Sequence, residues 1–178
     1  SVEPPATPET GLGVGALYVL CDGNYSLNNS TLALYDANEE QWDKDFFQSM
    51  AGRKLGDTGN DLQRYGDKVY IVMTASSQIE VLNARTGEPI KQISLFDGAV
   101  ARQPRYLAFW DNKAYVCSFD GTVARIDTAS LSVEALTSVG RHPDGLSAAN
   151  GKLYVANSGG LDFGDALGYD NTVSIVDL

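Results

Sequence analysis

The chain repeats one pattern of residues, and this repeat limits the folds that it can adopt. The stretch RHPDGLSAANGKLYVANSGG begins at Arg141, and RQPRYLAFWDNKAYVCSFDG begins 39 residues earlier, at Arg102. The two stretches share Arg, Pro, Leu, Lys, Tyr, Val and Gly at the same places. A weaker copy, DTGNDLQRYGDKVYIVMTAS, begins at Asp57, and GALYVLCDG is a partial fourth copy. Such a repeat predicts a fold in which each copy packs on its neighbours.

The length of the repeat favours the blades of an all-β propeller. One tyrosine recurs in the four copies, at Tyr18, Tyr70, Tyr115 and Tyr154, with spacings of 52, 45 and 39 residues. A second apolar run that ends in Asp or Asn follows each tyrosine. Short strands at periods near 40 to 45 residues are typical of four-stranded antiparallel blades. We expect the four tyrosines to occupy equivalent sites on the second strand of each blade and to pack between blades.

One blade can be traced almost completely from its turn residues. Residues 145–149 are expected to form its first strand, Asn150-Gly151 a tight turn, 153–157 the second strand and 172–177 the third. The small side chains of the first strand would suit a place nearest the propeller axis. In the preceding blade, residues 133–139 would form the fourth strand. We expect the end of segment 39–50 to be the fourth strand of the first blade.

The same reading over the whole chain gives fourteen strands, or about three and a half blades. Residues 1–14, which are rich in Pro and Thr, are expected to be a flexible tether. Residues 15–178 would form a partial propeller, with repeats that start near 15, 62, 107 and 146. Twice fourteen strands would make seven blades. We therefore expect either half of a larger propeller or the association of two half-propellers.

The repeated frame R-x-P-x-x-L, G-K-x-Y-V and T-V-x-x-I/V-D resembles that of the YncE-like, surface-layer-type β-propellers. More narrowly, YVLCDGN, RQPRYLAF, VCSFDGTVARIDT and LYVANSGGLD resemble exported surface lipoprotein propellers of gut Gram-negative anaerobes. The resemblance covers residues 15 to 178 and implies a seven-bladed propeller. It also implies a location at the outer-membrane surface or in the periplasm, and some members of this group capture cobalamin for an importer.

Composition removes several classes of function. The net charge is −10 and the pI about 4.4, so nucleic acid is not an expected partner. The chain has two cysteines, both in apolar runs where burial is expected, and His142 is its single histidine. The chain therefore has too few cysteine and histidine residues to make a zinc site or a histidine-based catalytic triad a favoured expectation. We expect a protein that is not an enzyme and has no cofactor. Calcium at residues 22–26, or at Asp162, Asp165 and Asp170, is a minor alternative.

The variable parts of the repeat are expected to line one face of the propeller. In this topology, the loops between second and third strands emerge beside the segments that join consecutive blades. These loops hold aromatic rings, amides and arginines, which suit a large polar ligand. The candidate ligand-binding residues are Asn24, Tyr25, Asn60, Arg102, Arg105, Tyr106, Phe119, Asp120, Arg141, Asp144, Asn157 and Asn171.

Two of these arginines allow more than one interpretation. Arg102 and Arg141 occupy the same repeat position, two residues before the proline. They could grip a phosphate or carboxylate of a ligand. The favoured interpretation is a repeated salt bridge between blades, for example with Asp61 or Asp144. Asp57, at the equivalent position of the weaker copy, could provide an opposite charge on a neighbouring blade.

Three functions follow from these expectations. The first is capture at the cell surface of a corrinoid such as cobalamin, for handover to an outer-membrane importer. The second is a structural or docking propeller for protein partners. The third is binding of a glycan.

Overall fold

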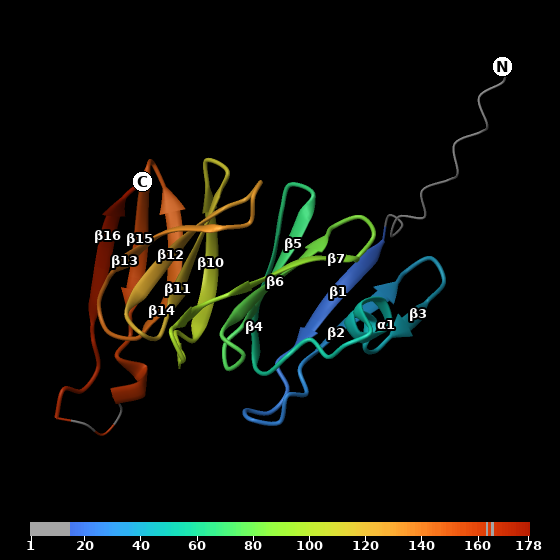
Figure 1. Ribbon diagram of the computed structural model, residues 1–178, viewed down its shortest axis with the longest axis horizontal. Helices are drawn as coiled ribbons and strands as arrows, with labels where there is room; N and C mark the ends of the chain where they lie inside the picture. Colours follow the sequence, from blue (N-terminus) through green and yellow to red (C-terminus); the bar gives the residue numbers. More distant parts are fainter. Residues whose placement is uncertain (1–14, 163, 165) are drawn as a thin grey trace, which may run out of the picture.

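The computed structural model describes residues 15–162, 164 and 166–178. Within them, four antiparallel sheets stand side by side in a row that follows the order of the sequence (Figure 1). In each sheet every strand pairs with the next strand along the chain. The architecture is therefore a series of propeller-like blades, which we number 1 to 4. The expected tether, residues 1–14, lies outside the described residues.

The blades contain fourteen strands, which is the expected number. Blade 1 contains β1 (Ala16–Cys21), β2 (Thr31–Asp36) and β3 (Gln41–Asp43), which correspond to the second, third and fourth strands of the four-stranded blades. Blade 2 contains β4 (Gly59–Tyr65), β5 (Lys68–Met73), β6 (Gln78–Asn83) and β7 (Pro89–Ser94). Blade 3 contains β10 (Pro104–Trp110), β11 (Lys113–Ser118), β12 (Thr122–Asp127) and β13 (Val133–Ser138). Blade 4 contains β14 (Pro143–Ala149), β15 (Lys152–Asn157) and β16 (Thr172–Asp177).

The repeated Pro and Leu enclose a register shift in the first strand of a blade. Pro104 pairs with Ser118 and Leu107 pairs with Val116, so β10 advances three residues while β11 advances two. The same shift lies between Pro143 and Leu146 in β14, and a matching one follows Gly59 in β4. One extra residue of this kind is a β-bulge, which bends the strand locally. The spacing P-x-x-L is thus the sequence pattern of the bulge.

The Asn-Gly pair closes a hairpin as expected. Asn150 and Gly151 have φ values of 51° and 71°, and they connect Ala149 and Lys152, which face each other in the sheet. Two residues with positive φ form the turn whose twist matches that of the flanking strands. Glycine takes this conformation without steric cost, and asparagine is one of the few other residues that tolerate it.

The repeated tyrosine is the third residue of the second strand in each blade. Tyr70 and Tyr115 are buried between blades, and Tyr18 is partly buried against Phe46, with ring centroids 5.7 Å apart. The expectation of burial is wrong for Tyr154, which is 38% exposed. No described element covers the side of blade 4 on which this ring lies.

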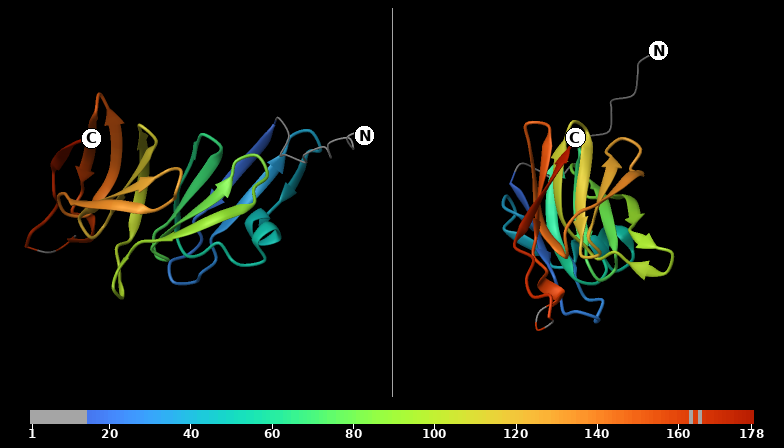
Figure 2. Two further views of the ribbon diagram at one scale, coloured as in Figure 1. Left: turned by 45° about the horizontal axis from the view of Figure 1, so that its top comes forward. Right: turned by 90° about the vertical axis from the view of Figure 1, so that its left-hand side faces the viewer.

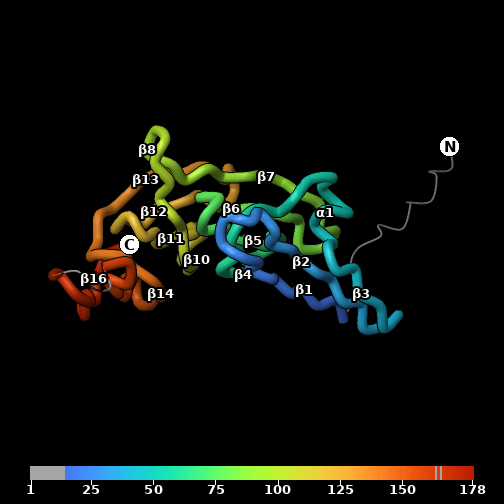
Figure 3. Tube along the Cα trace, turned by 90° about the horizontal axis from the view of Figure 1, so that it is seen from below, coloured from blue at the N-terminus to red at the C-terminus, as the bar shows by residue number. Residues whose placement is uncertain are grey.

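The first strands of the blades line one side of the row. β10 contacts both β4 and β14, and in Figure 3 these three strands lie opposite β7 and β13, which form the other side. The two views in Figure 2 show the same separation. Contact among first strands is what the expected position nearest the propeller axis requires.

Three local expectations need correction. The segment after β3 does not continue as a strand but forms helix α1 (Phe46–Ala51). Asp45 caps this helix by accepting a hydrogen bond from the Gln48 N–H, and Phe46 and Phe47 are buried. A short hairpin of β8 (Phe96–Asp97) and β9 (Val100–Ala101) interrupts an expected loop. Cys117 is buried, whereas Cys21 is exposed.

Candidate functional site

The expected loop face exists, and its parts are bonded to one another. We define the loop face as the loops between second and third strands together with the segments that join consecutive blades. In the first such loop, Ser30 forms a bridge with Gly56 of the segment before blade 2. The Arg141 side chain, which lies before blade 4, bonds Asp162 in the loop of that blade. The two kinds of loop therefore lie together, as the topology predicted.

One hollow opens on this face, and a second, which the face borders, is lined mainly by residues of β1 and β4. The first, of about 390 Å³, is lined by Phe119, Asp120 and Gly121 of blade 3 together with residues 138–142 and Asp170. The second, of about 850 Å³, is lined by residues 18–22 of β1 and its following loop, residues 58–62 and Arg105. Both volumes are in the range of small-molecule sites.

Arg105 links the neighbourhoods of the two hollows. Its guanidinium carbon lies 4.6 Å from the centroid of the Phe119 ring and 5.8 Å from that of Tyr106. Its Nε donates to Asp144 Oδ1 over 2.7 Å. Phe119 in turn meets His142 edge-on, with ring centroids 5.9 Å apart. The fold thus brings together four of the sequence-predicted residues: Arg105, Tyr106, Phe119 and Asp144.

Polar residues at one repeat position bond to one another across three consecutive blades. The second residue of β4, Asn60, donates from Nδ2 to the Arg105 carbonyl oxygen of blade 3 over 2.6 Å. The Arg105 side chain then reaches Asp144 of blade 4. Asn60, Arg105 and Asp144 occupy equivalent places, each directly after the first residue of its strand. This position joins neighbouring blades at the rim of the loop face.

Arg102 and Arg141 are both engaged in ion pairs, although not with the expected partners. Arg102 Nη1 lies 2.6 Å from Asp120 Oδ2, and its Nη2 lies 3.5 Å from Asp97 of the β8–β9 hairpin. Arg141 bonds Asp162 and donates to the carbonyl oxygen of Gly168. The salt bridges thus tie each arginine to nearby loops. The salt bridge between blades is made by Arg105 instead.

His142, Asp162 and Asp170 belong to this face but were not among the ligand-binding candidates, although the two aspartates were considered for calcium. His142 Nδ1 lies 2.8 Å from the Phe119 carbonyl oxygen, and its Nε2 lies 3.1 Å from Asp162 Oδ1. Burial acts to raise the pKa of Asp162, but hydrogen bonds from His142 and Arg141 outweigh it and hold this pKa below its usual value. The Thr172 hydroxyl and the Arg141 N–H lower the pKa of Asp170. The signal available in the sequence was the position of His142 beside the repeated arginine.

The remaining candidates divide between exposed and structural positions. Asn24, Tyr25 and Asn171 are exposed on loops, and Tyr25 is 71% exposed. Asn157 is buried; it accepts from the Gly140 N–H and donates to the hydroxyl groups of Thr172 and Ser174. Asn157 therefore holds the loop face together from inside and does not face a ligand.

The loop of the first calcium alternative is held by hydrogen bonds within the chain. Asp57, expected to oppose an arginine, accepts from the backbone N–H groups of Ser26 and Asn28 and from the Thr58 hydroxyl. It therefore orders the loop that the calcium alternative required. Among the described residues, no cluster of three or more His, Cys, Asp or Glu side chains has a geometry for a metal ion. Asp165 of the second acidic loop lies outside the described residues.

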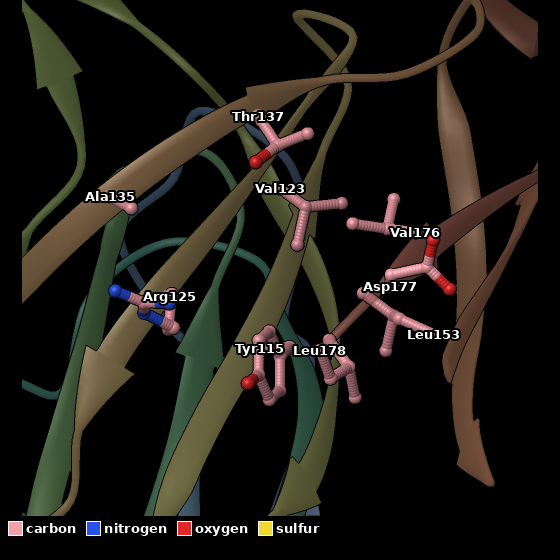
Figure 4. A pocket seen from close by; sticks show the side chains of 9 residues that line it. All are labelled: Tyr115, Val123, Arg125, Ala135, Thr137, Leu153, Val176, Asp177 and Leu178. Carbon is pink, nitrogen blue, oxygen red and sulfur yellow. The ribbon is translucent and has the colours of Figure 1, made fainter. Parts of the chain in front are cut away.

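A third, smaller hollow lies away from the loop face. Its volume is about 60 Å³, and it is lined by β11, β12 and β13 of blade 3, β15 and β16 of blade 4, and Leu178. Figure 4 shows Tyr115 and Val123 on one side of it and Leu153 and Val176 on the other. It is a gap in the junction between two blades. Within the described residues, no helix is long and apolar enough to span a membrane.

Comparison with solved structures supports the fold. BamB from Moraxella catarrhalis is similar with a TM-score of 0.59 and 17% identity, over 94% of this chain and 42% of that one. A protein of unknown function from Bacteroides caccae gives 0.58 and 14%, over 93% and 65%. The computationally designed Ika8 protein gives 0.65 and 14%, over 93% and 44%. The chain thus spans less than two thirds of each of these structures.

These similarities establish the architecture and nothing finer. The matches include β-propeller proteins, so the described blades form part of a β-propeller. A search of the curated proteins found no match. A family model described as "Domain of unknown function (DUF5074)" matches residues 15–165, which is most of the chain. The chain therefore belongs to the DUF5074 family.

Proposed function

We propose that this chain is a non-enzymatic capture module, exported to the outer-membrane surface as a lipoprotein, that binds a large polar small molecule on its loop face. A corrinoid such as cobalamin is the favoured ligand, and an outer-membrane importer is the partner that would receive it. The observation that carries the proposal is the cluster of Arg105, Tyr106 and Phe119 between hollows of about 850 and 390 Å³.

The chemistry of this cluster suits a ligand with a broad apolar face and polar arms. Aromatic rings such as Phe119 and Tyr106 offer faces for stacking. The Asn60 and Asp120 side chains border the two hollows and supply groups for hydrogen bonds to amide arms. Arg105 carries a cation that could meet a phosphate, after exchange of its bond to Asp144.

A docking propeller for protein partners is the second candidate, and one observation favours it. Arg102, Arg105 and Arg141, which would grip an anionic ligand, are all paired with carboxylates of the chain itself. Groups satisfied in this way stabilise the loop face as a preformed platform. A glycan would use the same aromatic and amide groups as a corrinoid, so titration with both ligands separates these two outcomes.

The test is isothermal titration of the chain with cyanocobalamin. Tyr106→Ala should weaken binding about 10- to 100-fold, because a fully buried aromatic contact is worth about 1.5–3 kcal/mol. Tyr154→Ala is the matched control, since Tyr106 is 37% exposed and Tyr154 is 38% exposed but lies outside the loop face. The control should bind as tightly as the unchanged chain.

Two results would contradict parts of the proposal. No heat with cyanocobalamin at micromolar concentrations would remove the corrinoid and leave the docking function or a glycan ligand. Equal weakening by both tyrosine variants would retain the ligand but reject the loop face as its site.

A further inference from the structure

His142 lies at the junction of blades 3 and 4, with a hydrogen-bond acceptor at each of its ring nitrogens. Nδ1 lies 2.8 Å from the carbonyl oxygen of Phe119, and Nε2 lies 3.1 Å from Oδ1 of Asp162. A carbonyl or carboxylate oxygen only accepts, so each contact is a hydrogen bond only while its nitrogen carries a proton. The neutral imidazole ring carries one such proton, and the imidazolium carries two. Both contacts together therefore require the charged ring.

The Asp162 carboxyl group is ionised and does not supply the missing proton. Its other oxygen, Oδ2, is bonded to Nη1 of Arg141, and a cation at this place favours the carboxylate. Burial acts to raise the pKa of Asp162, but the hydrogen bonds from His142 and Arg141 keep this pKa below its usual value. A ring that was turned over would present C–H groups to both acceptors and lose both bonds. The protonated ring is thus the form that fits these contacts.

The repeat holds the backbone of His142 in place. Its φ is 43°, in the left-handed region, and the residues at the equivalent places of blades 2 and 3, Thr58 and Gln103, both have a φ of 58°. In each of these blades, the carbonyl oxygen of this residue accepts from the N–H of the residue that follows the second strand. A change in the charge of the ring therefore alters its bonds and leaves the position of its backbone unchanged.

The ring of His142 links loops of two neighbouring blades. It reaches the loop that begins at Phe119 in blade 3 and the 3₁₀ turn η1 (Gly160–Asp162) in the loop of blade 4 (Figure 1). His142 and Phe119 also line the hollow of about 390 Å³. The side chains of His142 and Asp162 are only 22% and 17% exposed, so water replaces a lost bond poorly. A single proton therefore governs a contact between two blades.

The segments packed around His142 contain other ionisable groups. Among the described residues, they are Arg102 and Asp120, Arg105 and Asp144, Arg141, Tyr169 and Asp170. The first four form two ion pairs, of 2.6 and 2.7 Å, and Asp170 accepts from the Arg141 N–H over 2.9 Å. Asp162 is the carboxylate that pairs with the ring, and Arg141, which shares this carboxylate, is the cation that opposes the charge of the ring.

We propose that His142 is a proton-operated latch, which joins the loops of blades 3 and 4 while its ring is charged and releases one of them when the ring loses a proton. Histidine changes its charge between about pH 5 and 8. One nitrogen of the neutral ring keeps a lone pair, which would face the Phe119 carbonyl oxygen or the Asp162 carboxylate and be repelled. The contact is therefore complete on the acidic side of this range and incomplete on the alkaline side. The latch would operate whatever ligand the loop face binds.

The first test observes the ring directly, because His142 is the single histidine of the chain. Proton–nitrogen correlation spectra report which ring nitrogens carry a proton at each pH. At about pH 5.5 both N–H protons should be visible and protected from exchange with water. Asp162→Asn removes the charge that faces the ring, so it should move the midpoint of the titration to lower pH by about one unit, a tenfold change in proton affinity. Asp111→Asn, in the turn between β10 and β11 away from the loop face, is the control and should move it by less than about 0.3 unit.

The second test measures the loop of blade 4. The Asp162 N–H bonds the Gly159 carbonyl oxygen, and the Gly159 N–H bonds the Arg141 carbonyl oxygen. Protection factors from amide hydrogen exchange, which correct for the intrinsic effect of pH, should fall about 10-fold at these two amides between about pH 5.5 and 8.5, as expected for the loss of one charge-assisted hydrogen bond. His142→Gln should show no such fall, because its amide does not titrate, and Gln103 shows that the repeat accepts glutamine at this place. Circular dichroism checks that this variant is folded, and His142→Asn replaces it if it is not, since asparagine tolerates a positive φ.

Three results would overturn the proposal. They are ring N–H protons that exchange freely at about pH 5.5, a titration midpoint that Asp162→Asn moves no further than Asp111→Asn does, and a protection of Gly159 and Asp162 that falls equally in the unchanged chain and in His142→Gln.

Discussion

The buried hydroxyl group of Tyr70 gives the sharpest test of how the blades are packed. Tyr70 is fully buried, and its hydroxyl has no hydrogen-bond partner among the described residues. Its ring packs edge-on against Phe109, with centroids 5.1 Å apart. Burying a hydroxyl without a partner costs about 1–3 kcal/mol, while losing a large ring from a core costs about 3–5 kcal/mol. The two parts of this side chain should therefore have opposite effects on stability.

Tyr70→Phe removes only the hydroxyl and should raise the free energy of unfolding by about 1 kcal/mol, because a small void offsets part of the gain. Tyr70→Ala should lower it by about 3–5 kcal/mol. Urea denaturation followed by circular dichroism measures both changes. Tyr154 is the matched control, since it has the same strand position but lies on an uncovered face. Tyr154→Ala should cost less than about 1 kcal/mol in monomeric protein.

The stability advantage of Tyr70→Phe over the unchanged chain should also depend on pH. Burial, followed by the nearby charges of Asp67, Tyr65 and Asp127, raises the pKa of Tyr70 to about 12. The unfolded value is about 10, so the folded state holds this proton more tightly. The stabilisation is complete below pH 10 and is lost as the pH rises toward 12. Tyr70→Phe should escape this loss, so its stability advantage should grow over that interval. A loss of more than about 1 kcal/mol at pH 7 for Tyr70→Phe would refute the reasoning, because it would mean that the hydroxyl is bonded.

Three further predictions follow from polar side chains that are bonded within the chain. Arg53→Met removes the cation 2.7 Å from the fully buried Glu80 carboxylate, and should destabilise the chain by about 2–3 kcal/mol at pH 7 in urea denaturation. Since burial raises the pKa of Glu80, the loss should shrink near pH 4, where this carboxyl is protonated; an equal loss at both pH values would contradict this. Asp57→Ala should speed amide exchange in loop 22–30 by about 10-fold, measured by hydrogen exchange, with blade 3 as the internal reference. Asn157→Ala should lower the free energy of unfolding by about 1–3 kcal/mol in denaturation, while calorimetry should find the affinity for cyanocobalamin unchanged.

The strands were predictable because the residues that pack between blades recur in the sequence at a fixed spacing. A residue such as Leu107 or Tyr115 recurs at a fixed spacing since each blade must bury the same positions against its neighbours. Helix α1 was not predictable in this way. It has six residues, which is too short to show a helical period, and it owes its place to the burial of Phe46 and Phe47.

The candidate site was predictable as a face but not as a set of partners. The topology placed the loops correctly, whereas the identity of each ion pair depends on distances between loops of different blades. Arg102 and Arg141 share a repeat position and yet pair with Asp120 and Asp162, which do not occupy one repeat position. Asn157 is predicted as a ligand group because amides of the loop face suit a polar ligand, but three internal hydrogen bonds occupy its side chain.

The bulge between the repeated Pro and Leu separates residues that can change from residues that must stay constant. Residues inside it, such as Arg105 and Asp144, have no partner in the regular strand register, so they can change without moving Leu107 or Leu146 out of register with the neighbouring strand. Divergence can therefore accumulate at the rim while the interior of each blade stays constant. A family built on this element could acquire new recognition properties by exchanging rim residues, and each exchange would leave the folding of the blade nearly untouched.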